Sequence, residues 1–316
     1  MNILITGASG FVGRGLLEYL SDKSDTTLFV HSRSREWISK LTFAGRIIPL
    51  DVCTTEILNV NNIDCVIHLA GIAHDLDGKY TPADYEKVNT QGTIQMFDAF
   101  NKSTARVFVF MSSIKAAVDT AETPVDEDVV PAPTTPYGKS KQNAEAGLLA
   151  YSMPPGKFLY ILRPVMIHGK GNKGNLNLLY RYVQYGLPYV FGAYDNQRSF
   201  LTADNLNFII HRIMQGSYPS GVYHVCDDAP FSTTELISII AHNMDRSPRI
   251  WSLPKRIIEP LFSLSSALGI PASRYKTKLT ESLVASNARI KKVLGVDLPV
   301  SAHEGLSRTL KSFREH

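Results

Sequence analysis

The chain has 316 residues, which is long enough for one large α/β domain and a smaller lobe. Hydrophobic residues make up 44% and charged residues 20%, a balance that is typical of globular proteins and argues against disorder. The net charge of +4 comes from 33 basic and 29 acidic residues without a long basic run, which excludes a nucleic-acid partner but suits an anionic small substrate.

The three cysteines, Cys53, Cys65 and Cys226, lack the spacing of metal ligands, so we expect buried thiols in a reducing compartment and no metal site. No leader is expected, because a glycine-rich turn begins at the seventh residue, and no apolar run has membrane-spanning length. Residues 257–270 are apolar but interrupted by Glu259, which favours a buried or substrate-lobe helix over an interfacial anchor. These features predict a cytoplasmic protein without stable membrane insertion.

Short apolar runs alternate with helical periodicity along the chain, which predicts parallel strands joined by crossover helices. The expected strands are residues 2–6, 27–31, 46–50, 65–69, 107–111, 158–162 and 222–225. Helices are expected over residues 11–20, 85–100 and 137–151, the last after a cluster of prolines.

A glycine-rich turn follows the first expected strand and opens the first expected helix. Its first glycine allows the tight turn, the second lets the backbone approach a pyrophosphate, and the third lets the helix pack on the strand. The helix N-terminus attracts phosphates as well. The turn therefore predicts a dinucleotide site that includes Gly7, Gly10, Phe11, Val12 and Gly13.

Tyr137 and Lys141 are four residues apart, which places both on one face of the expected helix. A nearby ammonium stabilises a phenolate and lowers its pKa, which makes the tyrosine a usable acid or base. The same ammonium can hold the ribose of a nicotinamide cofactor. A hydroxyl of the Ser112-Ser113 pair, at the end of the 107–111 strand, is placed to orient the reacting oxygen.

At this point the sequence resembles the extended short-chain dehydrogenase/reductase family, in its nucleotide-sugar epimerase, dehydratase and reductase branch. The resemblance covers nearly the whole chain and includes the glycine turn, Val88-Asn89-Thr90-Gln91-Gly92-Thr93, the serine strand, the Tyr137–Lys141 motif and Arg163-Pro164. It implies that Ser113, rather than Ser112, is catalytic together with Tyr137 and Lys141. It further implies that the cofactor is contacted by Asp51, Val52, Leu69, Ala70, Gly71, Asn89 and Lys141.

The resemblance also implies a nucleotide-sugar site in the second half of the chain. Arg198 lies in a segment that is similar to the one whose arginine holds the nucleotide diphosphate, and Asn175 lies near the expected position of the sugar diphosphate. Asp204 is expected to cap or buttress the next helix. The substrate site is thus predicted to contain Ser113, Lys115, Tyr137, Asn175 and Arg198.

The residues after Ser113 and after the second strand bear on the reaction. Ile114 and Lys115 stand where sugar 4,6-dehydratases carry Asp-Glu, so a 4,6-dehydratase is not expected. The second strand ends without an acid for the ribose hydroxyls of NAD, and Arg33 is available for a 2′-phosphate, which favours NADP(H) over NAD(H). A solvated basic loop is the alternative for Arg33.

Three functions remain open from the sequence. The first is reduction of a UDP-4-keto-6-deoxy-N-acetylhexosamine at carbon 4, for synthesis of a surface polysaccharide. The second is a UDP-hexose 4-epimerase that retains NAD, and the third is a non-catalytic dinucleotide-binding regulator, a class that tends to lose the Tyr-Lys pair.

The fold class predicted from these features is α/β: a Rossmann doubly wound parallel sheet with a smaller C-terminal substrate-binding lobe. The dinucleotide-binding domain is expected over residues 1–165 plus approximately 200–228, and the nucleotide-sugar-binding lobe over 166–199 and 229–316. The helices over 85–100 and 137–151 carry more apolar residues than one stripe needs, which predicts a homodimer.

Overall fold

The computed structural model describes residues 1–32, 34, 36–43, 47–73, 79–172, 174–258, 260 and 280–314. Arg33 and most of the apolar segment 257–270 lie outside these described residues, so the predictions made for them have no structural counterpart here. Within the described part of the chain, no helix is both long and apolar enough to cross a membrane.

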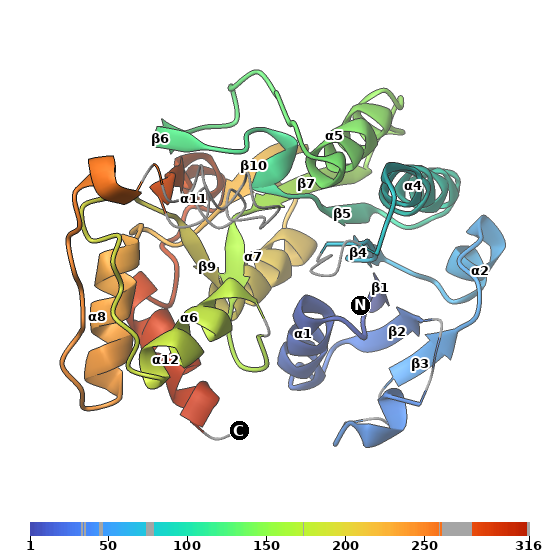
Figure 1. The fold of residues 1–316 in the computed structure, drawn as a ribbon. Helices are drawn as coiled ribbons and strands as arrows, with labels where there is room; N and C mark the ends of the chain where they lie inside the picture. Colours follow the sequence, from blue (N-terminus) through green and yellow to red (C-terminus); the bar gives the residue numbers. More distant parts are fainter. Residues whose placement is uncertain are drawn as a thin grey trace.

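Seven parallel strands form the central sheet, in the order β10-β7-β5-β4-β1-β2-β3 (Figure 1). The chain adds strands outward from β1 on one side, then returns across β1 to add the others on the opposite side. This arrangement is the doubly wound parallel sheet predicted from the sequence, and the fold class is confirmed. The strands are β1 Asn2–Thr6, β2 Thr27–His31, β3 Ile47–Leu50, β4 Cys65–His68, β5 Val107–Met111, β7 Phe158–Pro164 and β10 Gly221–Val225.

Side chains alternate between the two faces of the sheet, so each face has its own apolar core. One face packs on α1 Phe11–Ser21, α7 Ala203–Gln215 and α11 Ala288–Leu294. The opposite face packs on α2 Thr55–Val60, α4 Gly92–Lys102 and α5 Pro136–Leu149. Neighbouring β1 residues show the alternation, because Ile3 and Ile5 belong to the first core and Leu4 to the second.

The helix expected over residues 85–100 is interrupted in the structure. It consists of α3 Pro82–Tyr85, a π-helical turn over Glu86–Gln91, and α4. A π-helical turn inserts one extra residue per turn and changes which side chains face the sheet. The simple 3.6-residue periodicity of the sequence could not predict it.

Helices α4 and α5 lie side by side on the sheet (Figure 1), and Gly147 lets Ile94 pack closely. The buried apolar residues of these helices are Met96, Phe97, Phe100, Ala144 and Leu148, whereas Leu149 on α5 and Val88 in the preceding π-helical turn stay exposed at 56% and 41%. The expected surplus of apolar surface is therefore smaller than the sequence suggested, and the homodimer stays a prediction.

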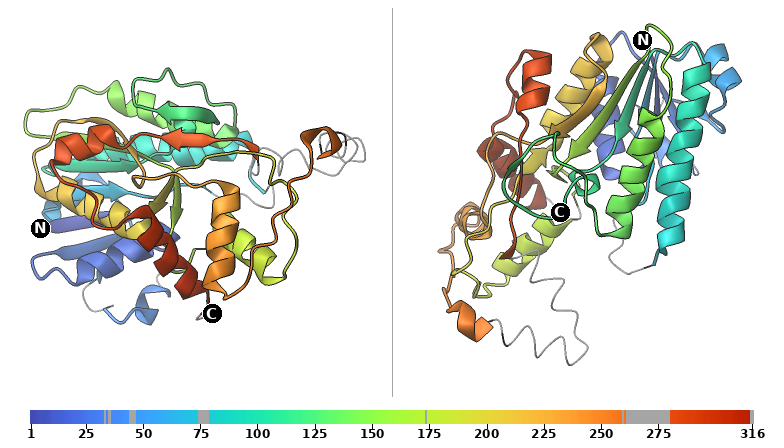
Figure 2. Two further views of the ribbon diagram at one scale, coloured as in Figure 1. Left: turned by 90° about the vertical axis from the view of Figure 1, so that its left-hand side faces the viewer. Right: turned by 90° about the horizontal axis from the view of Figure 1, so that it is seen from above.

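The C-terminal part of the chain packs beside the carboxyl ends of the strands (Figure 2). Two short parallel pairs lie here, β6 Ala121–Val125 with β11 Leu283–Ala285, and β8 Met166–His168 with β9 Phe200–Thr202. A third apolar core joins α6 Asn175–Gln184, α8 Thr233–Asn243 and α12 Ala302–Arg314. The division into two lobes at the boundaries given above stays a prediction.

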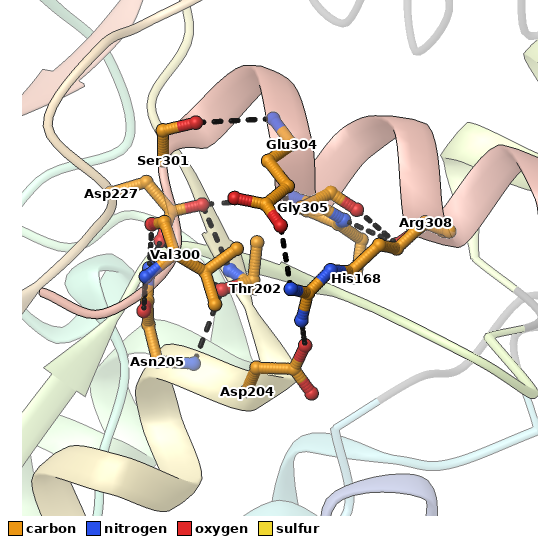
Figure 3. A network of polar contacts seen from close by, with 11 residues as sticks. His168, Thr202, Asp204, Asn205, Asp227, Val300, Ser301, Glu304, Gly305 and Arg308 are labelled. Carbon is orange, nitrogen blue, oxygen red and sulfur yellow. Dashed lines mark hydrogen bonds and ion pairs between the residues drawn. The ribbon is translucent and has the colours of Figure 1, made fainter.

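A polar network, buried around Asn205 and His168 and exposed at Arg308 and Asp204, anchors α12 and the segment before it (Figure 3). Asn205 donates hydrogen bonds to Asp227 at 2.7 Å and to the carbonyl of Val300 at 2.8 Å. His168 is hydrogen-bonded to Thr309 at 2.9 Å, and Arg308 forms an ion pair with Asp204 at 3.0 Å. The network ties α12 to β8 and to the start of α7.

Candidate active site

The glycine turn after β1 lies directly against the end of β4. Gly7 has a φ of +68°, and a Cβ added there would lie 2.6 Å from the backbone nitrogen of Ala70. The hydroxyl of Thr6 accepts a hydrogen bond from the same Ala70 amide at 3.3 Å. Only glycine therefore suits this position, because any side chain would push the two strand ends apart.

The N-terminus of α1 is open where this turn ends. Gly10 is the N-cap residue and supplies no capping side chain. A Cβ on Gly13 would lie 2.6 Å from the Cα of Ala8, so the helix packs closely on the turn. Uncapped amides at a helix N-terminus attract phosphate. The cradle fits the pyrophosphate of a dinucleotide, with Phe11 and Val12 providing the first amides.

The other expected cofactor residues lie at neighbouring strand ends. Asp51 and Val52 follow β3 and are exposed, and Leu69 donates from its backbone amide to Thr6 at 3.2 Å. The carboxyl ends of β1, β3 and β4 thus form one edge of the sheet, where open α/β sheets bind ligands. The roles of these residues in binding stay predictions.

The indole ring of Trp37 and the guanidinium of Arg14 lie near the end of β2. Trp37 donates from its ring nitrogen to Ser32 at 3.0 Å, and the guanidinium of Arg14 lies 5.8 Å from the indole centroid. Arg14 comes from the first turn of α1, so it is a basic group that the sequence analysis did not assign. Its position one residue after the last glycine of the turn was the available signal.

Asn89 is fully buried in the π-helical turn and clamps the segment after Gly71. Its side chain accepts from the amide of Ile72 at 2.7 Å and donates to the carbonyl of Ile72 at 3.0 Å. It also donates to Ser140 on α5 at 3.0 Å. Through these bonds Asn89 fixes the backbone of the 71–72 segment beside Lys141. A direct contact between Asn89 and the cofactor stays a prediction.

Tyr137 lies in the first turn of α5, at the carboxyl edge of the sheet. The helix begins here because Thr135 caps it, accepting from the amide of Gly138 at 3.1 Å, and Pro136 occupies the next position. A Cβ on Gly138 would lie 2.4 Å from the carbonyl oxygen of Lys115, so α5 packs directly against the turn that follows Ser113.

Burial raises the pKa of Tyr137, and the side chain of Ser113 opposes only part of this rise. The lowered pKa predicted from a neighbouring ammonium is therefore not observed. Burial favours the protonated form of Tyr137, and its role as a proton donor stays a prediction.

Lys141 is buried one turn further along α5, at 4% exposure. Its ammonium donates to the carbonyl of Met111 at 2.8 Å and lies 4.8 Å from the centroid of Phe110. Burial lowers the pKa of Lys141 to about 8, although Glu145 acts in the opposite direction. The lysine is thus fixed to the end of β5, which also carries Ser113.

The two serines at the end of β5 have different partners. Ser112 donates to the carboxylate of Glu145 behind the sheet edge, whereas Ser113 faces Tyr137 and accepts from the amide of Lys115 at 3.2 Å. Adjacent strand residues point in opposite directions. The geometry places Ser113, Tyr137 and Lys141 at one edge of the sheet, and their catalytic roles stay predictions.

Two half-buried cations, Lys115 and Arg198, lie near each other on the side of the C-terminal lobe. Burial is the main cause that lowers the pKa of Lys115, and the positive charge of Arg198 adds to it. Burial also lowers the pKa of Arg198. Asp119 and Glu281 offset part of this cost. Two desolvated cations that repel each other favour an anionic ligand between them.

Asn175 is the first residue of α6 and is half-buried. The loop before it is organised by Asn172, which is buried at 7% and accepts from the amide of Gly174 at 2.6 Å. Asn172 was not predicted as a functional residue from the sequence. Asp204 buttresses α7 through its ion pair with Arg308, while the cap itself is Thr202, which accepts from Asn205 at 3.2 Å.

The three cysteines are free: Cys65 and Cys226 are buried, and Cys53 is half-buried. Across the described ranges, no group of three or more His, Cys, Asp or Glu side chains is placed to hold a metal ion.

Comparison with known proteins places this geometry in a family. The model of the NAD dependent epimerase/dehydratase family matches residues 3–226. A UDP-glucose 4-epimerase of Vibrio cholerae is 30% identical over 99% of this chain and 95% of its own length. The N-acetyl-α-D-glucosaminyl-diphospho-ditrans,octacis-undecaprenol 4-epimerase of Escherichia coli O157:H7 is 27% identical over 98% of this chain and 94% of its own.

Solved structures have the same fold. The Bordetella bronchiseptica enzyme WbmG, in complex with NAD, superimposes with a TM-score of 0.78 at 20% identity, covering 100% of this chain and 94% of that one. The UDP-glucuronic acid 4-epimerase of Bacillus cereus, also in complex with NAD, gives a TM-score of 0.78 at 19% identity, with 100% and 99% covered.

Proposed function

The chain is an enzyme of the NAD dependent epimerase/dehydratase family, and we propose that it transfers a hydride at carbon 4 of a UDP-hexose. Its preferred direction is reduction of a 4-keto sugar, and the substrate class is a UDP-4-keto-6-deoxy-N-acetylhexosamine. The observation that carries the proposal is the buried Lys141, which is hydrogen-bonded to the end of β5 just before Ser113 and lies one turn after Tyr137 on α5, at the same sheet edge as the glycine cradle.

The nicotinamide dinucleotide supplies the hydride donor or acceptor when bound. The protein has to deliver the proton and hold the sugar. Tyr137 retains its proton because burial raises its pKa, so it can donate to the oxygen at carbon 4. Ser113 orients that oxygen through its hydroxyl, and the ammonium of Lys141 stabilises the phenolate that remains after transfer.

Lys115 and Arg198 are proposed to hold the diphosphate of the UDP-sugar. A diphosphate placed between them would meet two half-buried cations, and its negative charge would relieve the repulsion that Arg198 exerts on Lys115. Guanidinium groups suit phosphate because they donate two parallel hydrogen bonds. The proposal for the UDP moiety also rests on the relatives, whose names include UDP-glucose and UDP-glucuronic acid 4-epimerases.

Epimerisation at carbon 4 is the second candidate. It is favoured by the two relatives described above, both of which are 4-epimerases that align with nearly the whole chain. Reduction is favoured by the NADPH preference proposed below, since a chain that uses NADPH as reductant performs the net reduction of a keto sugar. A GDP-6-deoxy-D-mannose reductase of Pseudomonas aeruginosa, 26% identical over 76% of this chain and 79% of its own, shows that reductases occur among the relatives.

One experiment separates the two candidates. The purified protein is incubated with a UDP-4-keto-6-deoxy-N-acetylhexosamine plus NADPH or NADH, and in parallel with UDP-glucose or UDP-N-acetylglucosamine plus NAD. Stoichiometric oxidation of the reduced cofactor, with a 4-hydroxy product identified by NMR, supports reduction. Interconversion of the 4-epimers without net cofactor change supports epimerisation, and no turnover in either arm contradicts the proposal.

Cofactor preference is tested at the end of β2. We propose NADPH as the reductant, with Arg33 as the partner of the 2′-phosphate; NAD is the alternative, in keeping with the NAD-bound structures above. Arg33→Asp is expected to shift the ratio of dissociation constants from NADPH toward NADH, because the carboxylate repels the phosphate and accepts from ribose hydroxyls. Lys40→Asp, an exposed charge reversal nearby in sequence, is the control. Tighter binding of NADH than NADPH by the unmodified protein would refute the NADPH preference.

A further inference from the structure

A buried ion pair lies directly behind the proposed catalytic groups. Glu145 and Arg163 are 3% and 4% exposed, and the guanidinium contacts both carboxylate oxygens, with Nε–Oε1 at 3.0 Å and Nη2–Oε2 at 2.5 Å. Glu145 is four residues after Lys141 on α5, so both side chains lie on the same side of the helix. A pair this deep costs desolvation energy that an apolar pair would avoid. Because Glu145 lies one helical turn after Lys141, the ion pair is placed to act on this lysine.

The pair connects three elements of the sheet edge. Ser112, at the end of β5, donates its hydroxyl proton to Glu145, and Arg163 belongs to β7. Lys141 donates to the carbonyl of Met111, the residue before Ser112. Helix α5 is therefore attached to the end of β5 at two adjacent points, one through Lys141 and one through Glu145.

The guanidinium of Arg163 continues the chain of contacts to β10. Its Nη1 lies 3.5 Å from Nε2 of His224, whose Nδ1 donates to the carbonyl of Val125 at 3.1 Å. This pattern fits a neutral imidazole that accepts from Arg163, and burial lowers the pKa of His224 to about 4. Arg163 is thus held between Glu145 on α5 and His224 on β10.

The titratable and charged groups around Lys141 come from α5, β4, β7 and β10. Tyr137 on α5 stays protonated, and His68 on β4 is neutral, with a pKa lowered by burial to about 3. Arg163 on β7 is a cation, and His224 on β10 is a neutral imidazole. Among the described residues that act on the pKa of Lys141, Glu145 is the one that raises it.

We propose that Glu145 is a positioning residue that keeps Lys141 charged and α5 in register with Ser113, held for this purpose by Arg163 and Ser112. The inference rests on the proposed function, because it gives the ammonium of Lys141 the role of stabilising the Tyr137 phenolate. Without Glu145, the buried ammonium loses its anionic neighbour and releases its proton at lower pH.

The test reads the charge of Lys141 directly, by NMR titration of its 13Cε signal, which is assigned with the Lys141→Met variant. In Glu145→Gln, the pKa of Lys141 is expected to fall from about 8 by about one pH unit, a small change for the loss of one close charge. The alkaline limb of the turnover–pH profile should move by the same amount. Glu122→Gln removes an exposed carboxylate on β6 and serves as the control, with no shift in either measurement.

A second variant separates the loss of the Glu145 charge from the effect of leaving Arg163 unpaired in the core. Glu145→Gln leaves Arg163 buried without its partner, whereas Glu145→Gln combined with Arg163→Met removes both charges. Because the guanidinium opposes the carboxylate in its effect on Lys141, the pKa shift should be smaller in the double variant than in Glu145→Gln. An unchanged titration of Lys141 in folded Glu145→Gln would overturn the inference. A shifted titration in a protein that turns over no UDP-sugar would support Glu145 acting on Lys141 and contradict the proposed function instead.

Discussion

Replacing Gly7 by alanine tests whether the turn after β1 is a cofactor cradle or only a connection. Gly7 has a φ of +68°, a conformation that costs an L-residue about 1–2 kcal/mol. The added Cβ would also meet the backbone nitrogen of Ala70 at 2.6 Å, where ordinary contact begins at 3.4 Å. The turn and the end of β4 must therefore separate by about 0.8 Å, the difference between these two distances.

A shift of this size acts on function as well as on stability. The turn carries the open N-terminus of α1, and the end of β4 continues into the segment that borders Lys141. Misplacement by about 1 Å costs on the order of 10²-fold in rate where geometry decides turnover. Gly7→Ala is therefore expected to lower turnover about 10²-fold and to weaken dinucleotide binding, in addition to its effect on stability.

Gly295→Ala is the matched control for this variant. Gly295 has a nearly identical φ of +64°, but no atom lies within 4 Å of an added Cβ. Gly295→Ala should lose about 1–2 kcal/mol of unfolding free energy in guanidinium titrations, and Gly7→Ala should lose more because its Cβ also meets the backbone of Ala70. Only Gly7→Ala should lose cofactor affinity, measured by calorimetry with NAD and NADPH. Equal cofactor affinity in the two variants would refute the assignment of the turn to the dinucleotide.

Three further predictions concern chemistry, substrate and pH. Tyr137→Phe keeps the ring but removes the proton donor, so turnover should fall about 10²–10⁴-fold with an unchanged circular dichroism spectrum; near-normal turnover would exclude Tyr137. Arg198→Ala should weaken UDP binding by about 1.5–3 kcal/mol while cofactor affinity stays constant, and equal loss of both would indicate misfolding of the lobe. His68, His168 and His224 are buried with pKa values lowered to about 3, 4 and 4, so the unfolded chain takes up protons first. Unfolding free energy should therefore decrease as pH falls below about 6.5, partly offset by Asp227, whose pKa burial raises to about 6, and a flat profile in denaturant titrations would contradict this.

Local patterns in the sequence predicted the elements that surround the glycine turn and Tyr137. Each strand of the sheet is a short apolar run, and the structure moves their ends by only a few residues, as in β7 Phe158–Pro164 against the expected 158–162. The start of α5 follows from Thr135 and Pro136, whose capping and φ preferences are local. Sequence reasoning works here because the determining interactions lie within one turn of the chain.

Interactions between distant segments were not predictable in this way. Arg163 was noted as a motif without a role, because its partner Glu145 is 18 residues away and meets it only across the sheet edge. The clamp of Asn89 on Ile72 likewise depends on a π-helical turn that no periodicity indicates. The meeting of Lys115 and Arg198 requires the C-terminal lobe to fold back on β5.

The pKa of Tyr137 shows how burial changes an inference drawn from a motif. Spacing alone places an ammonium near the phenol and predicts a lowered pKa. In the structure burial removes water from both groups, so the pKa of the phenol rises and that of the ammonium falls. Both changes favour the neutral forms, a phenol and an amine. An anion such as Glu145 next to Lys141 is then what keeps the lysine charged, which is why the ion pair behind the active site belongs to its chemistry.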